Sequence, residues 1–256
     1  MEIFVVDAFT DTAFGGNPAG VVLLTEPRSA EWMQSVAAEM KHAETAFVDP
    51  TAQGAKPLRW FTPTTEVDLC GHATLATAHV LGGAQRFSTR SGELSCTPAE
   101  DGSITMDFPA DQPQPIEPGP DLLAGLPGVT ILATAQAVSD ILVEVASAAE
   151  VRALVPDLAA IGRIPNRGVI VTAPGDRPGL DVVSRCFYPV FGIPEDPVTG
   201  SAHCTLASWW APRLGDGPLT AEQASPRGGI VRMTLRGNRV SLSGRAVTVL
   251  KGQLLV

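Results

Sequence analysis

Glu44 lies in the segment HAETAFV, where small and apolar residues surround its carboxyl group. In a strand, alternation would place Glu44 on one face with Ala46 and Val48, and burial beside such groups raises the pKa of a carboxyl group. A carboxyl group tuned in this way can accept a proton and return it, so Glu44 is our candidate general acid and base. Taken alone, an acidic residue in a strand more often lies at a sheet edge or faces solvent.

Three further candidates stand at the starts of two expected helices. His72 follows Gly71 in a first turn, and Asp196 and Ser201 flank the second start in GIPEDPVTGSAHC. A helix N-terminus offers unpaired N–H donors and partial positive charge, which bind carboxylates or the enolate-like charge formed beside a carbonyl. The same dipole would keep His72 neutral. The plainer interpretation of each residue is a cap, a dipole partner or a surface group.

Hydrophobic periodicity and turn signals predict an α+β chain that supplies these helices and strands. In the first half we expect strands at 3–9, 21–24, 43–48, 58–62, 93–96 and 104–108, and helices from Ser29 to about Lys41 and at 71–81. In the second half we expect strands at 131–138, 141–145, 168–173, 182–187, 229–235 and 240–242, and helices at 149–155 and 200–210, the latter ending before Pro212. The proline-rich stretch 109–121 between the halves is expected to be a linker.

A local repeat connects the two halves. The segments RWFTP (59–63) and RCFYP (185–189) each end a strand and lead through a loop, containing Asp68 or Asp196, to a glycine that opens a helix. This order predicts two pseudo-symmetric domains whose helix N-termini face one cleft, where residues 44, 72, 196 and 201 would meet. The plainer interpretation is that an α+β chain produces such an order by chance.

Composition and motif searches exclude several classes of function. The net charge of −9, from 18 Lys+Arg against 27 Asp+Glu, argues against nucleic acid or an anionic membrane as partner. The absence of a secretory signal or a membrane-length apolar stretch, with four scattered cysteines, favours a cytoplasmic protein with reduced thiols. Dinucleotide, Walker and nucleophile-elbow motifs are missing, and the spacing of Cys70, His72 and His79 does not indicate a metal, so we expect neither cofactor nor metal.

Several motifs in this order resemble the phenazine-biosynthesis PhzF-like isomerase family, within the wider diaminopimelate-epimerase fold. The matching segments are VDAFTDTAFGGNPAGVVLL, AETAFV, RWFTPTTEVDLCGHATLATAHVL, GVIVTA and GIPEDPVTGSAHC, and the likeness runs from Ile3 to the closing SLSGRAVTVLKGQLLV. The resemblance implies two pseudo-symmetric domains, each a mixed, mostly antiparallel sheet wrapped around a central helix. We place them at 1–115, completed by a strand at 246–256, and at 116–245.

The resemblance also implies an activity and a set of site residues. The family's type reaction is a cofactor-free isomerisation of a dihydro-hydroxyanthranilate in a biosynthetic process, and members are often homodimers. Its catalytic residues fall on Glu44 as the proton shuttle and on His72, Asp196 and Ser201 as positioning and polarising groups. We predict substrate-binding groups beside them at Asn17, Gly71, Ala73, Thr199, Gly200 and Ala202. The expected partner is therefore a small anionic or carboxylate-bearing metabolite.

Departures from the family pattern keep other functions open. Epimerases of this fold use a cysteine before each helix-opening glycine, whereas this chain has Cys70 before Gly71 but Thr199 before Gly200. A two-thiol racemase is therefore disfavoured, and Cys70 is expected to be a small packed residue, although a one-thiol epimerase or dehydratase remains an alternative. A non-catalytic protein that binds an anionic metabolite is another. The chain is also short for the family, PRGGIVRMTL (226–235) differs from the usual pattern, and Trp209-Trp210 indicates an altered interface.

Overall fold

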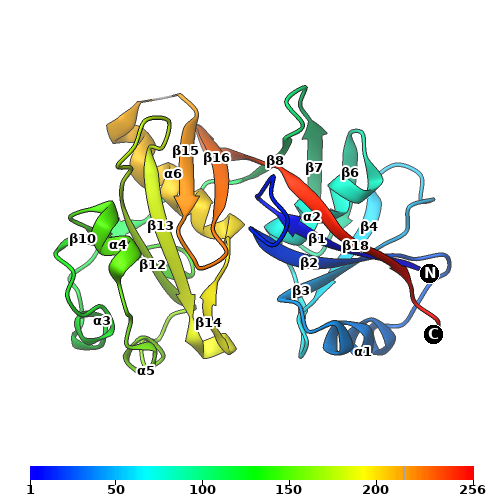
Figure 1. Ribbon diagram of the computed structural model, residues 1–256, viewed down its shortest axis with the longest axis horizontal. Coiled ribbons are helices and arrows are strands. Elements are labelled where there is room, and N and C mark those ends of the chain that lie inside the picture. Colours follow the sequence, from blue (N-terminus) through cyan, green and yellow to red (C-terminus); the bar gives the residue numbers. More distant parts are fainter. Residues whose placement is uncertain (216) are drawn as a thin grey trace. The chain divides into compact units, whose positions relative to one another are not determined.

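The computed structural model describes residues 1–215 and 217–256, which form two compact units. Unit 1 comprises Met1–Asp107 and Ser243–Val256, and unit 2 comprises Phe108–Leu242. The C-terminal strand returns to the first unit, where it lies beside the first strand of the chain (Figure 1). The expected division into folding domains at 115 and 245 stays a prediction.

Unit 1 is a mixed sheet with one helix on each face. Its strands are β1 (Glu2–Ala8), β2 (Asn17–Leu23), β3 (Glu44–Val48), β4 (Lys56–Phe61), β5 (Glu66–Val67), β6 (Gln85–Thr89), β7 (Gly92–Pro98), β8 (Ile104–Pro109) and β18 (Ala246–Gln253). The order runs β18-β1-β2-β3-β4, and β5 and β6 pair with the remaining edge of β4 before β7 and β8 follow.

The two helices of unit 1 differ in how deeply they are buried. In α2 (Gly71–Leu81), seven consecutive residues from His72 to Ala78 are buried, and the helix packs against β1, β2, β3 and β18. Burial on all sides makes α2 the central helix of the unit. The other helix, α1 (Ala30–Met40), is capped by Ser29 as predicted and buries Met33, Val36 and Ala37 against β3 and β4.

Unit 2 repeats this plan with more helices. Its strands are β9 (Gln114–Pro115), β10 (Ile131–Gln136), β11 (Asp140–Val145), β12 (Gly168–Pro174), β13 (Val182–Tyr188), β14 (Ile193–Asp196), β15 (Leu219–Gln223), β16 (Gly229–Arg236) and β17 (Arg239–Gly244). The order runs β9-β10-β11-β12-β13, with β14 and β15 on the remaining edge of β13 and β16 beside β15. The helices are α3 (Pro120–Gly125), α4 (Ala148–Ala153), α5 (Leu158–Ile161), the 3-10 turn η1 (Pro189–Phe191) and α6 (Gly200–Leu214).

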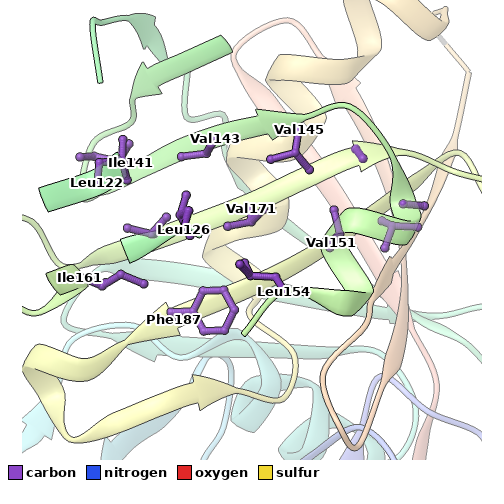
Figure 2. Close-up of a cluster of buried hydrophobic side chains, with 14 of the residues drawn as sticks. Leu122, Leu126, Ile141, Val143, Val145, Val151, Leu154, Ile161, Val171 and Phe187 are labelled. Atoms are coloured by element: carbon purple, nitrogen blue, oxygen red, sulfur yellow. The ribbon is translucent and has the colours of Figure 1, made fainter. Parts of the chain in front are cut away.

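Side-chain alternation gives the unit 2 sheet two buried faces. On one face, Ile141, Val143 and Val145 of β11 join the apolar cluster formed with α3, α4 and α5 (Figure 2). The intervening residue Glu144 faces α6, where its carboxylate accepts hydrogen bonds from Trp209 Nε1 at 2.8 Å and Arg213 Nη1 at 2.9 Å. The sheet is thus covered on both sides, and α6 is the buried central helix of unit 2.

The structure corrects several sequence expectations. Helix α6 continues through Pro212 to Leu214, because Arg213 holds the last turn by its bonds to Glu144 and by stacking 4.1 Å from the Trp210 ring centroid. The Trp209-Trp210 pair thereby anchors α6 within unit 2. The expected linker at 109–121 carries the short strand β9 and the start of α3, with Pro120 in its first turn, where a missing N–H is tolerated. Within the described residues, we found no helix both long and apolar enough to cross a membrane.

Candidate active site

Glu44 and His72 lie together at the start of the central helix of unit 1. Glu44 opens β3 opposite Ala19 of β2, and His72 is the second residue of α2. His72 Nε2 lies 3.3 Å from Glu44 Oε2, a close contact whose alignment falls short of a hydrogen bond. The two side chains are 7% and 15% exposed, so the contact is largely shielded from water while the carboxylate keeps some access.

Cys70 completes this group, which we call the Glu44 group (Glu44, Cys70 and His72). Its Sγ lies 3.5 Å from His72 Nδ1. Cys70 is the N-cap of α2, and its backbone carbonyl accepts hydrogen bonds from Thr74 N at 3.1 Å and Thr74 Oγ1 at 2.6 Å. The thiol therefore faces the histidine from a fixed backbone position. Cys70 was predicted to be a small packed residue, and its contact with His72 is one that the C-x-H spacing at a helix start could have indicated.

The protonation state of His72 follows from its burial. Burial lowers the pKa of His72 to about 3, and nearby His42 adds to the shift. The ring is therefore neutral at physiological pH and carries one proton, on either Nδ1 or Nε2. A neutral imidazole can donate one hydrogen bond and accept another, as the prediction of a neutral His72 requires.

The Glu44 group is also the candidate metal site within the described residues. One ligand atom from each of the three side chains lies within 4.8 Å of the other two. However, His72 turns Nδ1 to Cys70 and Nε2 to Glu44, whereas a metal would take one nitrogen and draw both other ligands to it. The arrangement fits a series of contacts running from thiol to carboxylate better than a ligand set.

Two predicted substrate-binding residues of unit 1 lie on the elements next to this group. Asn17 begins β2 and is fully buried, and Ala73 follows His72 and is fully buried. Gly20 of β2 lies against Thr45 of β3, where an added Cβ would come within 2.9 Å of the threonine hydroxyl. This close approach keeps the strands around Glu44 tightly packed.

In unit 2, Asp196 is held at the start of α6 by a second group, the Asp196 group (Asp196, Thr199 and Gln223). The Thr199 hydroxyl donates to Asp196 Oδ2. Gln223 of β15 is fully buried; its Nε2 donates to Asp196 O at 2.7 Å, and its Oε1 accepts from Thr199 N at 2.8 Å. These bonds fix the loop before α6. Gln223 was missed because β15 was not predicted.

Ser201 belongs to a separate set of contacts at the same helix start. Its Oγ accepts a hydrogen bond from Arg167 Nη2 at 2.9 Å, and Arg167 Nε donates to buried Asp140 Oδ1 at 2.8 Å. The guanidinium also stacks 5.1 Å from the Tyr188 ring centroid. Arg167 places a cation beside the exposed Ser201 hydroxyl, and its position directly before the apolar run GVIVTA is the signal that could have indicated it.

The two central helices share an unusual start. The N-cap residues Cys70 and Thr199 have extended backbones, but in the described structure neither side chain caps its helix. The Cys70 thiol turns to His72, and the Thr199 hydroxyl turns to Asp196. The first-turn N–H groups, including those after Gly71 and Gly200, therefore retain donor capacity and positive potential for an anion.

A hollow of about 270 Å³ elsewhere in unit 1 contains none of the predicted site residues. It lies where β4, β5 and β6 diverge, and Arg59, Trp60 and Arg90 line it.

The structure brings Glu44 and His72 together in one group, and it places Asp196 and Ser201 at the start of α6 with different partners. The two groups belong to different units.

The matches to known proteins extend over nearly the whole chain. Residues 6–252 match the family described as phenazine biosynthesis-like protein, PhzC-PhzF. An uncharacterized isomerase of Halalkalibacterium halodurans is 45% identical over 263 residues, covering 99% of this chain and 98% of that protein. The crystal structure of a PhzF-family phenazine biosynthesis protein from Enterococcus faecalis has a TM-score of 0.94 at 39% identity, with 100% of this chain and 99% of that chain covered.

A protein of much lower sequence identity has the same fold. A predicted epimerase of Pseudomonas aeruginosa has a TM-score of 0.78 at 20% identity, covering 100% of this chain and 99% of that chain. At this identity the likeness concerns the fold alone. The predicted fold class, an α+β chain of the epimerase type, is confirmed by these matches.

Proposed function

Because the chain belongs to the phenazine biosynthesis-like (PhzC-PhzF) family, we propose that it is a cofactor-independent isomerase with Glu44 as general acid and base. The reaction would move a proton between carbons of a small carboxylate-bearing substrate. Family membership and the isomerase relative support a general isomerase role. The observation that supports the proton transfer is the contact of Glu44 with His72 at the uncapped start of α2.

The proposed chemistry needs one group that both takes and returns a proton. Glu44, as a carboxylate, removes a proton from carbon, and the electrons of the broken C–H bond delocalise into the substrate as an enolate-like charge. The protonated Glu44, whose side chain is 15% exposed and can exchange its proton with solvent, then delivers a proton to a second carbon, and the delocalised electrons form the new C–H bond. His72 holds the carboxyl group in place, and the N–H groups at the start of α2 stabilise the developing negative charge.

We assign substrate binding and polarisation to Asp196 and Ser201, with Thr199, Gly200 and Ala202 beside them. Arg167 supports this assignment because its guanidinium lies next to Ser201, where a substrate carboxylate would gain a charge-assisted hydrogen bond. The proposal that both groups act on one substrate rests on their matched positions, each at the start of a central helix. Cytoplasmic location and homodimer formation stay predictions.

A second candidate function is an epimerase or dehydratase that uses the Cys70 thiol. The observation that favours it is the position of Cys70 Sγ, 3.5 Å from an imidazole nitrogen that could accept its proton. Against it, the matching position of unit 2 carries Thr199, whose hydroxyl is engaged with Asp196. Cys70→Ser separates the two, because it would be severe for a catalytic thiol and mild for proton transfer by Glu44.

The direct test is a deuterium-exchange screen. Cyclic and amino-acid carboxylates are incubated with the protein in D₂O, and carbon-bound deuterium is measured by NMR and mass spectrometry, with binding followed in parallel by thermal shift. The proposal predicts that a carboxylate which stabilises the protein also acquires deuterium at carbon. Stabilisation by several carboxylates without exchange in any of them would favour a non-catalytic binding protein.

A further inference from the structure

The imidazole of His72 lies between two different partners. One ring nitrogen, Nδ1, is 3.5 Å from Cys70 Sγ, and the other, Nε2, is 3.3 Å from Glu44 Oε2. His72 is only 5% exposed, so protein groups and not water are the main hydrogen-bond partners of its ring nitrogens. The partner of each nitrogen therefore decides which of them carries the single proton of the neutral ring.

The two possible tautomers differ in their fit to these partners. With the proton on Nε2, the N–H group points toward the Glu44 carboxylate, and the lone pair of Nδ1 can accept a hydrogen bond from the thiol S–H. With the proton on Nδ1, the Nε2 lone pair would face the lone pairs of the carboxylate, which is repulsive. The thiol supplies the donor that the favourable tautomer requires, because an ionised carboxylate has no proton of its own to give.

We propose that Cys70 is a positioning residue that donates its thiol proton to His72 Nδ1 and so keeps the ring proton on Nε2, directed at Glu44. This inference rests on the function proposed above and assigns Cys70 a role in it. The Nε2–H group then faces Glu44 Oε2, and the Glu44 carboxylate exchanges the proton with the substrate. The thiol stays protonated throughout and forms no bond to the substrate.

The backbone at Cys70 supports a positioning role. The Cys70 carbonyl is fixed by both the backbone N–H and the hydroxyl of Thr74, so the side chain starts from an anchored point. Its thiol makes no capping bond to α2, although the N-cap is where a polar side chain is normally used for that purpose. In the described structure the thiol instead serves the histidine two residues later.

Four variants and one kind of spectrum test this inference. Histidine-selective ¹⁵N labelling and long-range ¹H–¹⁵N spectra report the tautomer of each of the four histidines, and His72→Asn identifies the His72 signals. We expect wild type and Cys70→Ser, which keeps a donor, to show the Nε2–H form. Cys70→Ala should show a mixture of tautomers. The matched control Cys96→Ala removes the same atom from another buried position of unit 1 and should leave the His72 signals unchanged.

Activity is measured on the carboxylate that exchanges fastest with wild type. Cys70→Ala should lower the exchange rate on the order of tenfold or more, as the loss of an orienting partner does in other sites, while Cys70→Ser and Cys96→Ala stay close to wild type. Unchanged His72 signals in Cys70→Ala would overturn the inference, even with the function intact. A Cys70→Ser protein as inactive as Cys70→Ala, with the Nε2–H form retained, would overturn it in favour of a catalytic thiol.

The spectra do not depend on turnover, so the two proposals fail separately. The expected tautomer shift in Cys70→Ala without exchange of any carboxylate would support the positioning contact and count against the proposed function. Exchange that survives in Cys70→Ala at the wild-type rate would overturn the positioning role.

Discussion

In unit 1, Arg59 of β4 binds both oxygens of Glu66, at 2.7 and 2.8 Å, and in unit 2, Arg185 of β13 binds both oxygens of Glu195, at 2.7 and 2.9 Å. Each guanidinium also lies 5.1 Å from the aromatic ring two residues later in its strand. A short antiparallel strand and a parallel strand share the remaining edge of β4, and the same holds for β13. The two units therefore build the same frame before their central helices.

The residues set on this frame differ. Unit 1 has Cys70, Gly71 and His72 at the helix start, whereas unit 2 has Thr199, Gly200 and Ser201. The first set brings a carboxylate, an imidazole and a thiol together, and the second set presents hydroxyl groups beside a cation and a buried carboxylate. The repeated fold thus carries a thiol and an imidazole at one helix start and hydroxyl groups at the other. The scaffold therefore supplies the two helix starts, and a few side chains determine what each of them can do.

The expected equivalence of Asp68 and Asp196 does not extend to their surroundings. The Asp68 side chain is 71% exposed and pairs with Arg90, whereas Asp196 is buried and bonded to Thr199. Only Asp196 lies in a shielded environment at a helix start. The local repeat therefore predicts the loops correctly and not the burial of their acidic residues.

The largest expected effect is on stability and tests whether the two frames are equally important. Arg185 is 11% exposed and also donates to Leu154 O at 2.6 Å, so Arg185→Met would leave a carboxylate that is only 16% exposed, and a backbone carbonyl, without this partner. We expect a loss of about 3–5 kcal/mol in the free energy of unfolding. Arg59→Met should cost less, about 1–2 kcal/mol, because Arg90 still lies 2.6 Å from Glu66. Urea unfolding measures both, and equal losses would contradict the difference.

A second prediction concerns the buried histidine in each central helix. Burial lowers the pKa of His72 to about 3 and that of His203 to about 4, both below the ordinary value near 6.5 in the unfolded chain. Because the unfolded state binds more protons, stability is complete above pH 6.5 and falls as the pH drops toward the folded pKa values. Each histidine should remove about 2 kcal/mol at pH 5.

Substitution tests this pH dependence in each unit separately. The free energy of unfolding, measured with urea, falls between pH 7 and pH 5. His72→Asn and His203→Gln should each reduce that fall by about 2 kcal/mol, the contribution of one histidine. A dependence that stays the same in both variants would show that neither ring is buried in its neutral form.

The smallest effect distinguishes binding from proton transfer. Ser201→Ala removes the hydroxyl that accepts from Arg167 and leaves the Arg167 bond to Asp140 in place. We expect the KM of an exchanging carboxylate to rise about fivefold with kcat nearly unchanged, the size of one hydrogen bond. Ser208→Ala, which removes a hydroxyl bonded to Cys204 O on the same helix, is the control. A fall in kcat without a change in KM would move unit 2 into the proton-transfer step.

Local patterns were sufficient for the elements that carry the site. Apolar runs, Ser29 as a cap and glycines at helix starts predicted β3, α1 and the beginnings of α2 and α6. Strands β6 and β15 were missed because their residues are mixed in polarity, and their place in the sheet comes from pairing with β4 and β13.

The partners of the site residues could not be predicted in the same way. Arg167 reaches Ser201 across 34 positions of sequence, and Gln223 reaches Thr199 across 24, so only the folded sheet brings them together. By contrast, the Cys70–His72 contact spans two residues and was within reach of local analysis. Local chemistry was therefore predictable, and long-range polar partners were not.

Glu44→Gln in the deuterium-exchange assay is the sharpest test of whether Glu44 carries the proton. Glutamine keeps the shape but cannot take a proton, so exchange into a bound carboxylate should fall about 10²–10⁴-fold. The thermal shift produced by the same carboxylate, and the activity of the exposed control Glu31→Gln, should remain at wild-type values. Exchange by Glu44→Gln at the wild-type rate would show that Glu44 is not the proton carrier.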